Sequence, residues 1–169
     1  MNLHPLSWNI RHRTRDGLIL FDSGWQRNVL PYEGEQLVLG SFFRNDPLAT
    51  PASFQIGLCN MAPVATTTAA TLSGEPSGGG YGRIAVGRDL IDWPSLSPVA
   101  GIVGNPYVIT SMTYTMTAVT NNIGPFSSVF MVAMVGTTPY LISAASSGGM
   151  TSIPVGDSAD ITVAITLTT

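Results

Sequence analysis

Two pairs of closely spaced carboxylates, Glu33 with Glu35 and Asp89 with Asp92, are the first candidates for chemistry in this sequence. Hydrolysis of a glycosidic bond needs one carboxylic acid and one carboxylate that flank the bond. Both pairs lie beside turn residues, where a solvated carboxylate is the favoured interpretation. The two pairs therefore give no positive argument for a hydrolase.

Nucleophilic and metal-dependent chemistry have fewer candidates still. A Ser-His-Asp or Cys-His site would have to use His4 or His12, which are the two histidines of the chain and lie near its beginning. They are too far apart, and too poorly supplied with carboxylates or cysteines, to suggest a metal site. Cys59 is the single cysteine, and its strand-like setting favours a small buried thiol over a reactive one. We therefore expect a protein that is not an enzyme and binds no cofactor.

Residues 74–86 form the most distinctive local sequence, with three consecutive glycines at positions 78–80. A phosphate-binding loop would end in Gly-Lys-Ser/Thr and lead into a helix, whereas this run leads into a β pattern. We predict instead a tight loop in which the glycines supply positive φ angles. Tyr81 and Arg83 would then project from the first residues of a strand.

Three aromatic residues near glycine-rich turns, Tyr81, Trp93 and Tyr107, are candidates for stacking on sugars. Aromatic residues in such places more often cap a core, and that role is favoured here. Carbohydrate binding stays open as an alternative function.

The first 17 residues are predicted to form an extended arm, outside a folded domain at residues 18–169. The arm carries four candidate partner-binding residues, Trp8, Arg11, Arg13 and Arg15. One interpretation is a solvated, poorly ordered terminus. The other is an arm laid along an acidic neighbouring subunit with Trp8 as its apolar anchor, because Trp and Arg are enriched where interfaces concentrate their energy.

The rest of the chain has the pattern of an all-β protein. Only 10% of its residues are charged, and Thr, Val, Ile and Ser dominate the second half. Period-two alternation or unbroken apolar runs predict strands at residues 54–59, 107–118, 129–135 and 161–167. One short helix is expected around residues 37–43. We predict one antiparallel β-sandwich or jelly roll with an extended N-terminal arm and at most one short helix.

Between Trp93 and Gly156 the sequence contains no Asp, Glu, Lys, Arg or His. A typical protein exterior is roughly 25–35% charged, so we expect much of this stretch to be covered by the fold itself or by other subunits. Residues 129–135 are apolar on both faces, as in a strand buried on both sides. Residues 107–118 have one apolar face and one Thr-rich face, and we predict that another subunit contacts Thr113, Thr115 and Thr117.

Overall charge and hydropathy argue against two classes of partner. The net charge of −3 provides no general basic field for nucleic acid. No window approaches the roughly 18 consecutive apolar residues of a membrane-spanning helix. The beginning of the chain lacks the apolar core of a signal peptide, so we expect folding in a cytoplasm.

Several short motifs occur in a fixed order along the chain. They are Phe54-x-Ile56-Gly57-Leu58, Gly78-Gly79-Gly80-Tyr81-x-Arg83-x-x-Val86, Val108-Ile109-Thr110, Gly124-Pro125 and Gly156-Asp157-x-x-x-Ile161-x-Val163-x-Ile165-x-Leu167. Together they resemble a family of small β-rich accessory virion proteins of tailed bacteriophages over roughly residues 54–169. In that family a Trp is expected just before the Val-Thr strand, where this chain has Pro106-Tyr107.

The resemblance implies a structural role in virion assembly. We expect a capsid cement or decoration protein, a homo-oligomer and specifically a trimer, whose arm ties it to the shell. Its partners would be further copies of itself and the major capsid protein or tail proteins of the same virion, assembled in the host bacterial cytoplasm. A tail or baseplate accessory protein, such as a fibre adaptor or receptor-binding module, is the alternative, because capsid and tail proteins can share β domains of this kind.

Overall fold

The structure, a computed structural model, describes residues 6–44, 50–98 and 107–166. Within these ranges the elements in chain order are β1 (Leu6–Arg13), β2 (Ile19–Asp22), β3 (Gln26–Val29), α1 (Tyr32–Phe43), β4 (Ser53–Cys59), β5 (Ile84–Val86), β6 (Ser95–Pro98), β7 (Tyr107–Thr110), β8 (Tyr114–Thr117), β9 (Ser128–Val135), β10 (Thr138–Ser146) and β11 (Ser158–Thr166). The strand pairings are antiparallel. The predicted all-β class with one short helix is confirmed.

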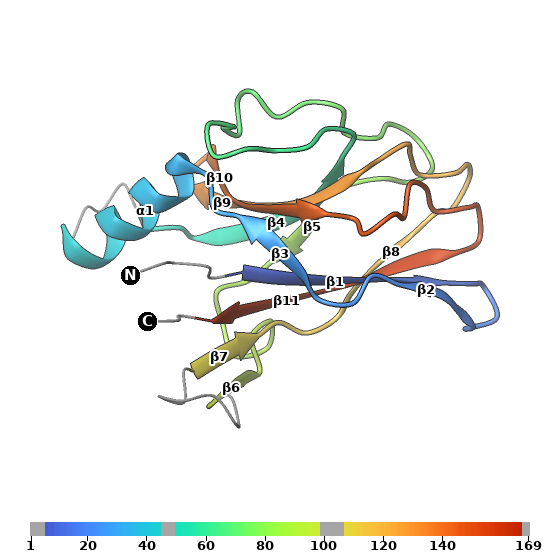
Figure 1. The fold of residues 1–169 in the computed structure, drawn as a ribbon, viewed down its shortest axis with the longest axis horizontal. Helices are drawn as coiled ribbons and strands as arrows, with labels where there is room; N and C mark the ends of the chain where they lie inside the picture. Colours follow the sequence, from blue (N-terminus) through green and yellow to red (C-terminus); the bar gives the residue numbers. More distant parts are fainter. Residues whose placement is uncertain (1–5, 45–49, 99–106, 167–169) are drawn as a thin grey trace.

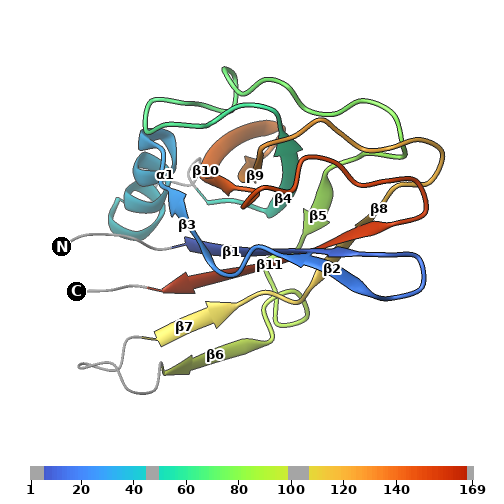
Figure 2. The same cartoon turned by 45° about the vertical axis from the view of Figure 1, so that its right-hand side comes forward.

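The strands form one sheet that curls over itself into two facing layers (Figure 1). The order is β5-β4-β9-β10-β3-β1-β11-β7-β6, with β2 paired to β1 and β8 paired to β11. Figure 2 shows β4, β9 and β10 in one layer and β1, β11, β7 and β6 in the other. β3 joins the layers because it pairs with both β10 and β1. The fold is therefore sandwich-like, but its layers belong to one continuous sheet.

Apolar side chains fill the space between the layers and a second space outside them. The main core includes Val129, Met131 and Ala133 of β9. A smaller cluster on the opposite face of the same strand contains Phe130 and Val132, with Met61, Ala69 and Leu72 packed against it. The prediction that residues 129–135 are buried on both faces is thus confirmed for residues 129–133. The segment that covers the outer face belongs to the same chain.

The N-terminal segment is not an arm over the residues that the structure describes. Residues 6–13 form β1, which pairs with β11 along its whole length and with β2 and β3 on its other side. Trp8 and Ile10 are fully buried. β1 is therefore an interior strand of the sheet, and the predicted boundary at residues 17 and 18 falls inside the β1–β2 hairpin.

The prediction of an arm at residues 1–17 was wrong for a reason that is visible in the chain. Trp8 and Ile10 alternate with Asn9 and Arg11, which is the period of a strand with one buried face. The three arginines favoured an arm over a strand. Charged residues, however, also occur at outward-facing positions of a strand. Residues 1–5 of the predicted arm lie outside the described ranges.

The strand predicted at residues 107–118 is two strands, β7 and β8, both paired with β11. Thr110 is opposite Ala164 and Tyr114 is opposite Ile161, so this side of the ladder contains one residue more than β11 does. Such a bulge reverses which alternate residues point inward. Ile109 accordingly packs against the core, although the uninterrupted pattern placed it on the Thr-rich face.

The helix α1 packs against β10 and begins five residues before the predicted one. Gly34 permits the close approach, because a Cβ atom there would lie 2.8 Å from the Cα atom of Ile142. Glu33 Oε2 accepts hydrogen bonds from the backbone N–H groups of Leu141 (2.6 Å) and Ala69 (2.8 Å). The solvated role expected for Glu33 was therefore wrong, whereas Glu35 is exposed.

Candidate interaction surface

Trp8 and Arg11, two of the residues predicted to bind a partner, contact other parts of their own chain. Trp8 Nε1 donates a 2.9 Å hydrogen bond to the buried Ser143 Oγ in the opposite layer. Arg11 Nε donates to Asp22 Oδ2 at 2.8 Å across the β1–β2 hairpin. These contacts position β1 within the fold, and contact of the exposed Arg11 with a partner stays a prediction.

Asp160 on β11 is the point where two of the predicted sites meet. Arg13 Nε on β1 donates to Asp160 Oδ2 at 2.8 Å, and Thr115 Oγ1 on β8 donates to Asp160 Oδ1 at 2.8 Å. Asp160 is only 5% exposed, so these bonds satisfy a buried carboxylate. Sequence reasoning missed Asp160, because only the pairing of β11 with both β1 and β8 brings these residues together. The one sequence feature that could have identified Asp160 is a carboxylate next to a strand of alternating apolar residues.

The three threonines predicted to contact a subunit, Thr113, Thr115 and Thr117, are exposed. Thr113 Oγ1 lies 3.1 Å from Thr162 Oγ1 in a hydrogen bond across the sheet. The hydroxyl groups of Thr113 and Thr115 therefore support the sheet itself, and contact with another subunit stays a prediction. Arg15 is exposed near the tip of the β1–β2 hairpin, where its backbone N–H donates to Asp157 Oδ1 at 3.1 Å.

The glycine-rich loop carries a half-buried polar cluster. Gly78, Gly79 and Gly80 have φ angles of 91°, 64° and 86°, as predicted. The Tyr81 hydroxyl donates to Glu75 Oε2 at 2.9 Å, and Arg83 Nε donates to the same oxygen at 3.0 Å. The cluster attaches the loop to β4, because the Tyr81 hydroxyl also accepts a 3.0 Å bond from the backbone N–H of Leu58.

Electrostatics within this cluster favour an ionised Glu75 and a neutral Tyr81. Burial opposes ionisation of Glu75, but hydrogen bonds from Arg83 and Tyr81 outweigh it and hold the pKa of Glu75 below its usual range. Burial raises the pKa of Tyr81. The Arg83 guanidinium also lies 5.1 Å from the centre of the Phe130 ring. The motif residues Tyr81 and Arg83 therefore hold the loop against β4.

The carboxylates Asp89 and Asp92 organise a turn. Asp89 Oδ1 accepts from the backbone N–H groups of Ile91 and Asp92, both at 2.9 Å. Asp92 accepts from the backbone N–H of Gly87 and, at 3.1 Å, from the Tyr114 hydroxyl. Burial raises the pKa of Tyr114, and its bond to Asp92 acts in the same direction. No group of three or more His, Cys, Asp or Glu residues suited to a metal ion occurs in the described ranges.

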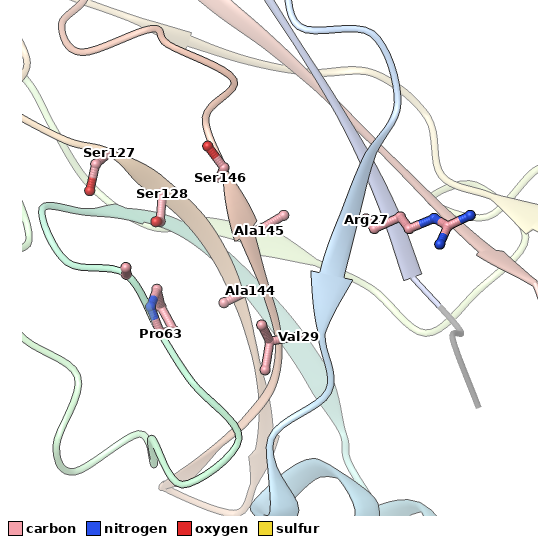
Figure 3. A pocket seen from close by; sticks show the side chains of 9 residues that line it. Arg27, Val29, Pro63, Ser127, Ser128, Ala144, Ala145 and Ser146 are labelled. Carbon is pink, nitrogen blue, oxygen red and sulfur yellow. The ribbon is translucent and has the colours of Figure 1, made fainter. Parts of the chain in front are cut away.

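A hollow of about 260 Å³ lies between β3 and the segment that follows β4. Figure 3 shows its small lining side chains, with the Arg27 side chain directed away from them. The hydroxyls of Ser127 and Ser128 donate to the carbonyl oxygen of Met61 at 3.2 and 2.7 Å. The polar groups of this hollow are thus engaged with the backbone, and its wall is otherwise formed by Val29, Pro63 and alanines.

A second hollow, of about 310 Å³, lies beside the N-terminal end of α1. Tyr32 and Gln36 of the helix line one side of it, and Thr66 and Tyr140 belong to the facing segments. The carboxylate of Glu33 also borders this hollow, but its Oε2 atom is held by two backbone N–H groups. Aromatic rings and uncharged polar groups therefore form most of its wall.

Exposed side chains that are mostly apolar gather on several parts of the molecule, among them α1 and the β6–β7 hairpin. The first, which we call the helix stripe, consists of Tyr32, Gln36, Leu39 and Phe43 along α1. The second, which we call the hairpin patch, consists of Leu90, Ile91, Leu96, Tyr107 and Met112 on the β6–β7 hairpin and the adjoining turns. Figure 2 shows that hairpin standing away from the β4, β9 and β10 layer.

The hairpin patch is unusual for a solvent-facing surface. Leu90 and Ile91 are 86% and 80% exposed, and all four residues of β6 are exposed. β6 is also the last strand of the sheet order. Several large apolar side chains exposed in one region are typical of protein interaction sites. Trp93, in contrast, is buried edge-on against Phe54, so it caps the core as favoured from the sequence.

In comparisons with known proteins, no family model, no curated protein and no solved structure matches the chain. Among the described residues, no helix is long and apolar enough to cross a membrane.

Proposed function

We propose that this protein is a structural component of a tailed-phage virion, and specifically a capsid cement or decoration protein that acts as a homo-oligomer. The observation that carries the proposal is the pair of exposed, mostly apolar surfaces, the hairpin patch and the helix stripe. The resemblance of the motifs in residues 54–169 supports the assignment to a virion. The major capsid protein is the proposed partner beyond the chain itself.

Burial of these surfaces across neighbouring subunits would stabilise the assembled state. Covering one large apolar side chain contributes about 1.5–3 kcal/mol, and the hairpin patch contains five. Part of that gain is lost to the ordering and desolvation that accompany association. β6 and β7 contain no charged residue, so no ion of these two strands has to be desolvated, whereas Leu90 and Ile91 lie between Asp89 and Asp92. A protein with such a surface favours the assembled shell by binding it and not the free subunits.

Attachment to the shell is assigned to these surfaces and not to an N-terminal arm. β1 is an interior strand, and Arg11 and Arg13 are paired with Asp22 and Asp160 of the same chain. Removing β1 to test attachment would therefore test folding instead. A substitution on the hairpin patch is the better probe.

The experiment is to measure the copy number of the chain in purified particles by quantitative mass spectrometry. Hundreds of copies per particle are expected of a shell decoration protein. A handful or a few dozen copies would move the protein to the tail or baseplate, and absence from particles would refute a virion role. The variant Leu96→Asp should reduce the copy number while circular dichroism reports an unchanged fold. Ala85→Asp serves as the control, because Ala85 is exposed on β5, the strand at the other end of the sheet order.

A further inference from the structure

The helix stripe has the geometry of a helix-packing seam. Its members Tyr32, Gln36, Leu39 and Phe43 follow at intervals of four, three and four residues, the spacing that aligns side chains for contact with a second helix. Tyr32 is 57%, Leu39 is 49% and Phe43 is 81% exposed. The opposite side of α1, with Gly34 and the buried Leu37, already packs within the chain. One face of the helix is therefore occupied and the other presents a complete seam.

The two ends of this stripe are complementary in shape. Phe43, an extended aromatic side chain, marks the C-terminal end of α1. The 310 Å³ hollow lined by Tyr32, Gln36 and Tyr140 marks the N-terminal end. About 16 Å of helix separates them at 1.5 Å per residue. A second α1 laid antiparallel along the first brings its Phe43 to this hollow, and the same contact repeats at the other end.

We propose that two copies of this chain associate through α1 about a two-fold axis, with the helices antiparallel and Phe43 of each copy seated in the hollow beside Tyr32 of the other. Such a contact is isologous, because both copies use the same surface. The inference rests on the proposed assembly function. It names a second copy of the chain as the partner that binds the helix stripe. A two-fold contact predicts a dimer and not the trimer expected from the sequence.

Charge favours the antiparallel arrangement over the parallel one. Glu35 is exposed in the first turn of α1, and Arg44 is exposed at its C-terminal end. Antiparallel helices place Arg44 of one copy within about one turn of Glu35 of the other and align the helix dipoles favourably. Parallel helices would place like charges together. The contact is small, because α1 has 12 residues. It falls short of the roughly 800 Å² per partner typical of stable complexes, so association should depend on concentration.

Sedimentation velocity over a range of concentrations tests the contact in solution. The unmodified chain should shift from monomer to dimer as concentration rises, and Phe43→Asp should weaken the association at least tenfold. Leu18→Asp is the matched control, since Leu18 is also exposed but lies outside both the helix stripe and the hairpin patch. Circular dichroism establishes that both variants fold. Unchanged association of Phe43→Asp, a trimer, or a monomer at every concentration would overturn the proposal.

Disulfide trapping tests the orientation. Phe43→Cys and Tyr32→Cys chains can carry tags of different length, so that a mixed dimer is recognised by its size. The two variants should form a mixed disulfide when combined, and Phe43→Cys alone should not cross-link. Cross-linking of Phe43→Cys with itself would indicate parallel helices and overturn the antiparallel arrangement. The native Cys59 is buried and should stay silent. If both tests fail but the chain is still found in particles, the α1 contact is refuted and the virion role stands. If the chain forms the dimer but is absent from particles, the virion role is refuted and the α1 contact stands.

Discussion

The position of β1 inside the sheet predicts that the first residues of the chain are needed for folding. Trp8 is fully buried and donates to Ser143 Oγ in the opposite layer. Replacing a buried Trp or Phe by Ala costs about 3–5 kcal/mol, out of a total stability of about 5–15 kcal/mol for a typical domain. Trp8→Ala should therefore remove a large share of the stability, and deletion of residues 1–13 should abolish folding.

Urea unfolding followed by far-ultraviolet circular dichroism measures this loss. With a denaturant slope of about 2 kcal/mol per molar urea, a loss of 3–5 kcal/mol moves the midpoint of Trp8→Ala down by about 1.5–2.5 M. Arg11→Ala is the matched control on the same strand. Its ion pair with Asp22 is exposed, and such pairs contribute about 0–1 kcal/mol.

A free energy of unfolding that is nearly the same before and after the Trp8→Ala substitution would refute a structural role for β1. If the urea midpoint of Trp8→Ala were no lower than that of Arg11→Ala, the packing of β1 would add little to the stability of the sheet. A chain without residues 1–13 that still unfolds cooperatively would restore the interpretation of this segment as an arm. The two variants together separate the burial of an apolar side chain from the loss of a surface charge.

Three further predictions concern residues 57–83. Gly57→Ala should lower stability by about 1–3 kcal/mol, because the new Cβ would meet the Phe130 ring, whereas Gly82→Ala meets nothing within 4 Å and should be nearly neutral. The lowered pKa of Glu75 stabilises the fold above the ordinary Glu pKa of 4.5; this contribution is lost as pH falls through the folded-state value, and Glu75→Gln should flatten that part of the stability–pH curve in urea titrations. Burial raises the pKa of Cys59 to about 11, so a thiol reagent at pH 8 should modify Cys59 only in urea; rapid labelling of the native chain would contradict its burial.

The local pattern of the sequence was sufficient where a strand has a simple environment. β9 could be predicted with both faces buried, because its run of apolar residues is unbroken by any polar one from 129 to 135. The helix α1 was also predictable, although its start was placed late because Gly34 counts against a helix in isolation. Gly34 is there for the approach to Ile142, a contact that only the folded chain defines.

The features that could not be predicted depend on pairing between distant strands. No local marker reveals the extra residue between β7 and β8, and that one residue reverses the faces of Val108 and Ile109. The hydrogen bonds of Asp160 to Arg13 and Thr115 likewise could not be predicted, because those two residues belong to different strands. The helix stripe was accessible in principle, since its four, three and four spacing can be read from the sequence.

Charge distribution links the fold to the proposed role. Arg11, Arg13 and Arg83 form ion pairs with carboxylates of their own chain, so three of the seven arginines help to hold the fold together. The helix stripe and the hairpin patch contain no charged side chain. Bringing a charged group into an interface costs more than bringing in an uncharged one, unless the charge finds a partner there. Burying the helix stripe and the hairpin patch in an assembly therefore costs less than burying a charged surface would, and this agrees with a chain in which only 10% of residues are charged.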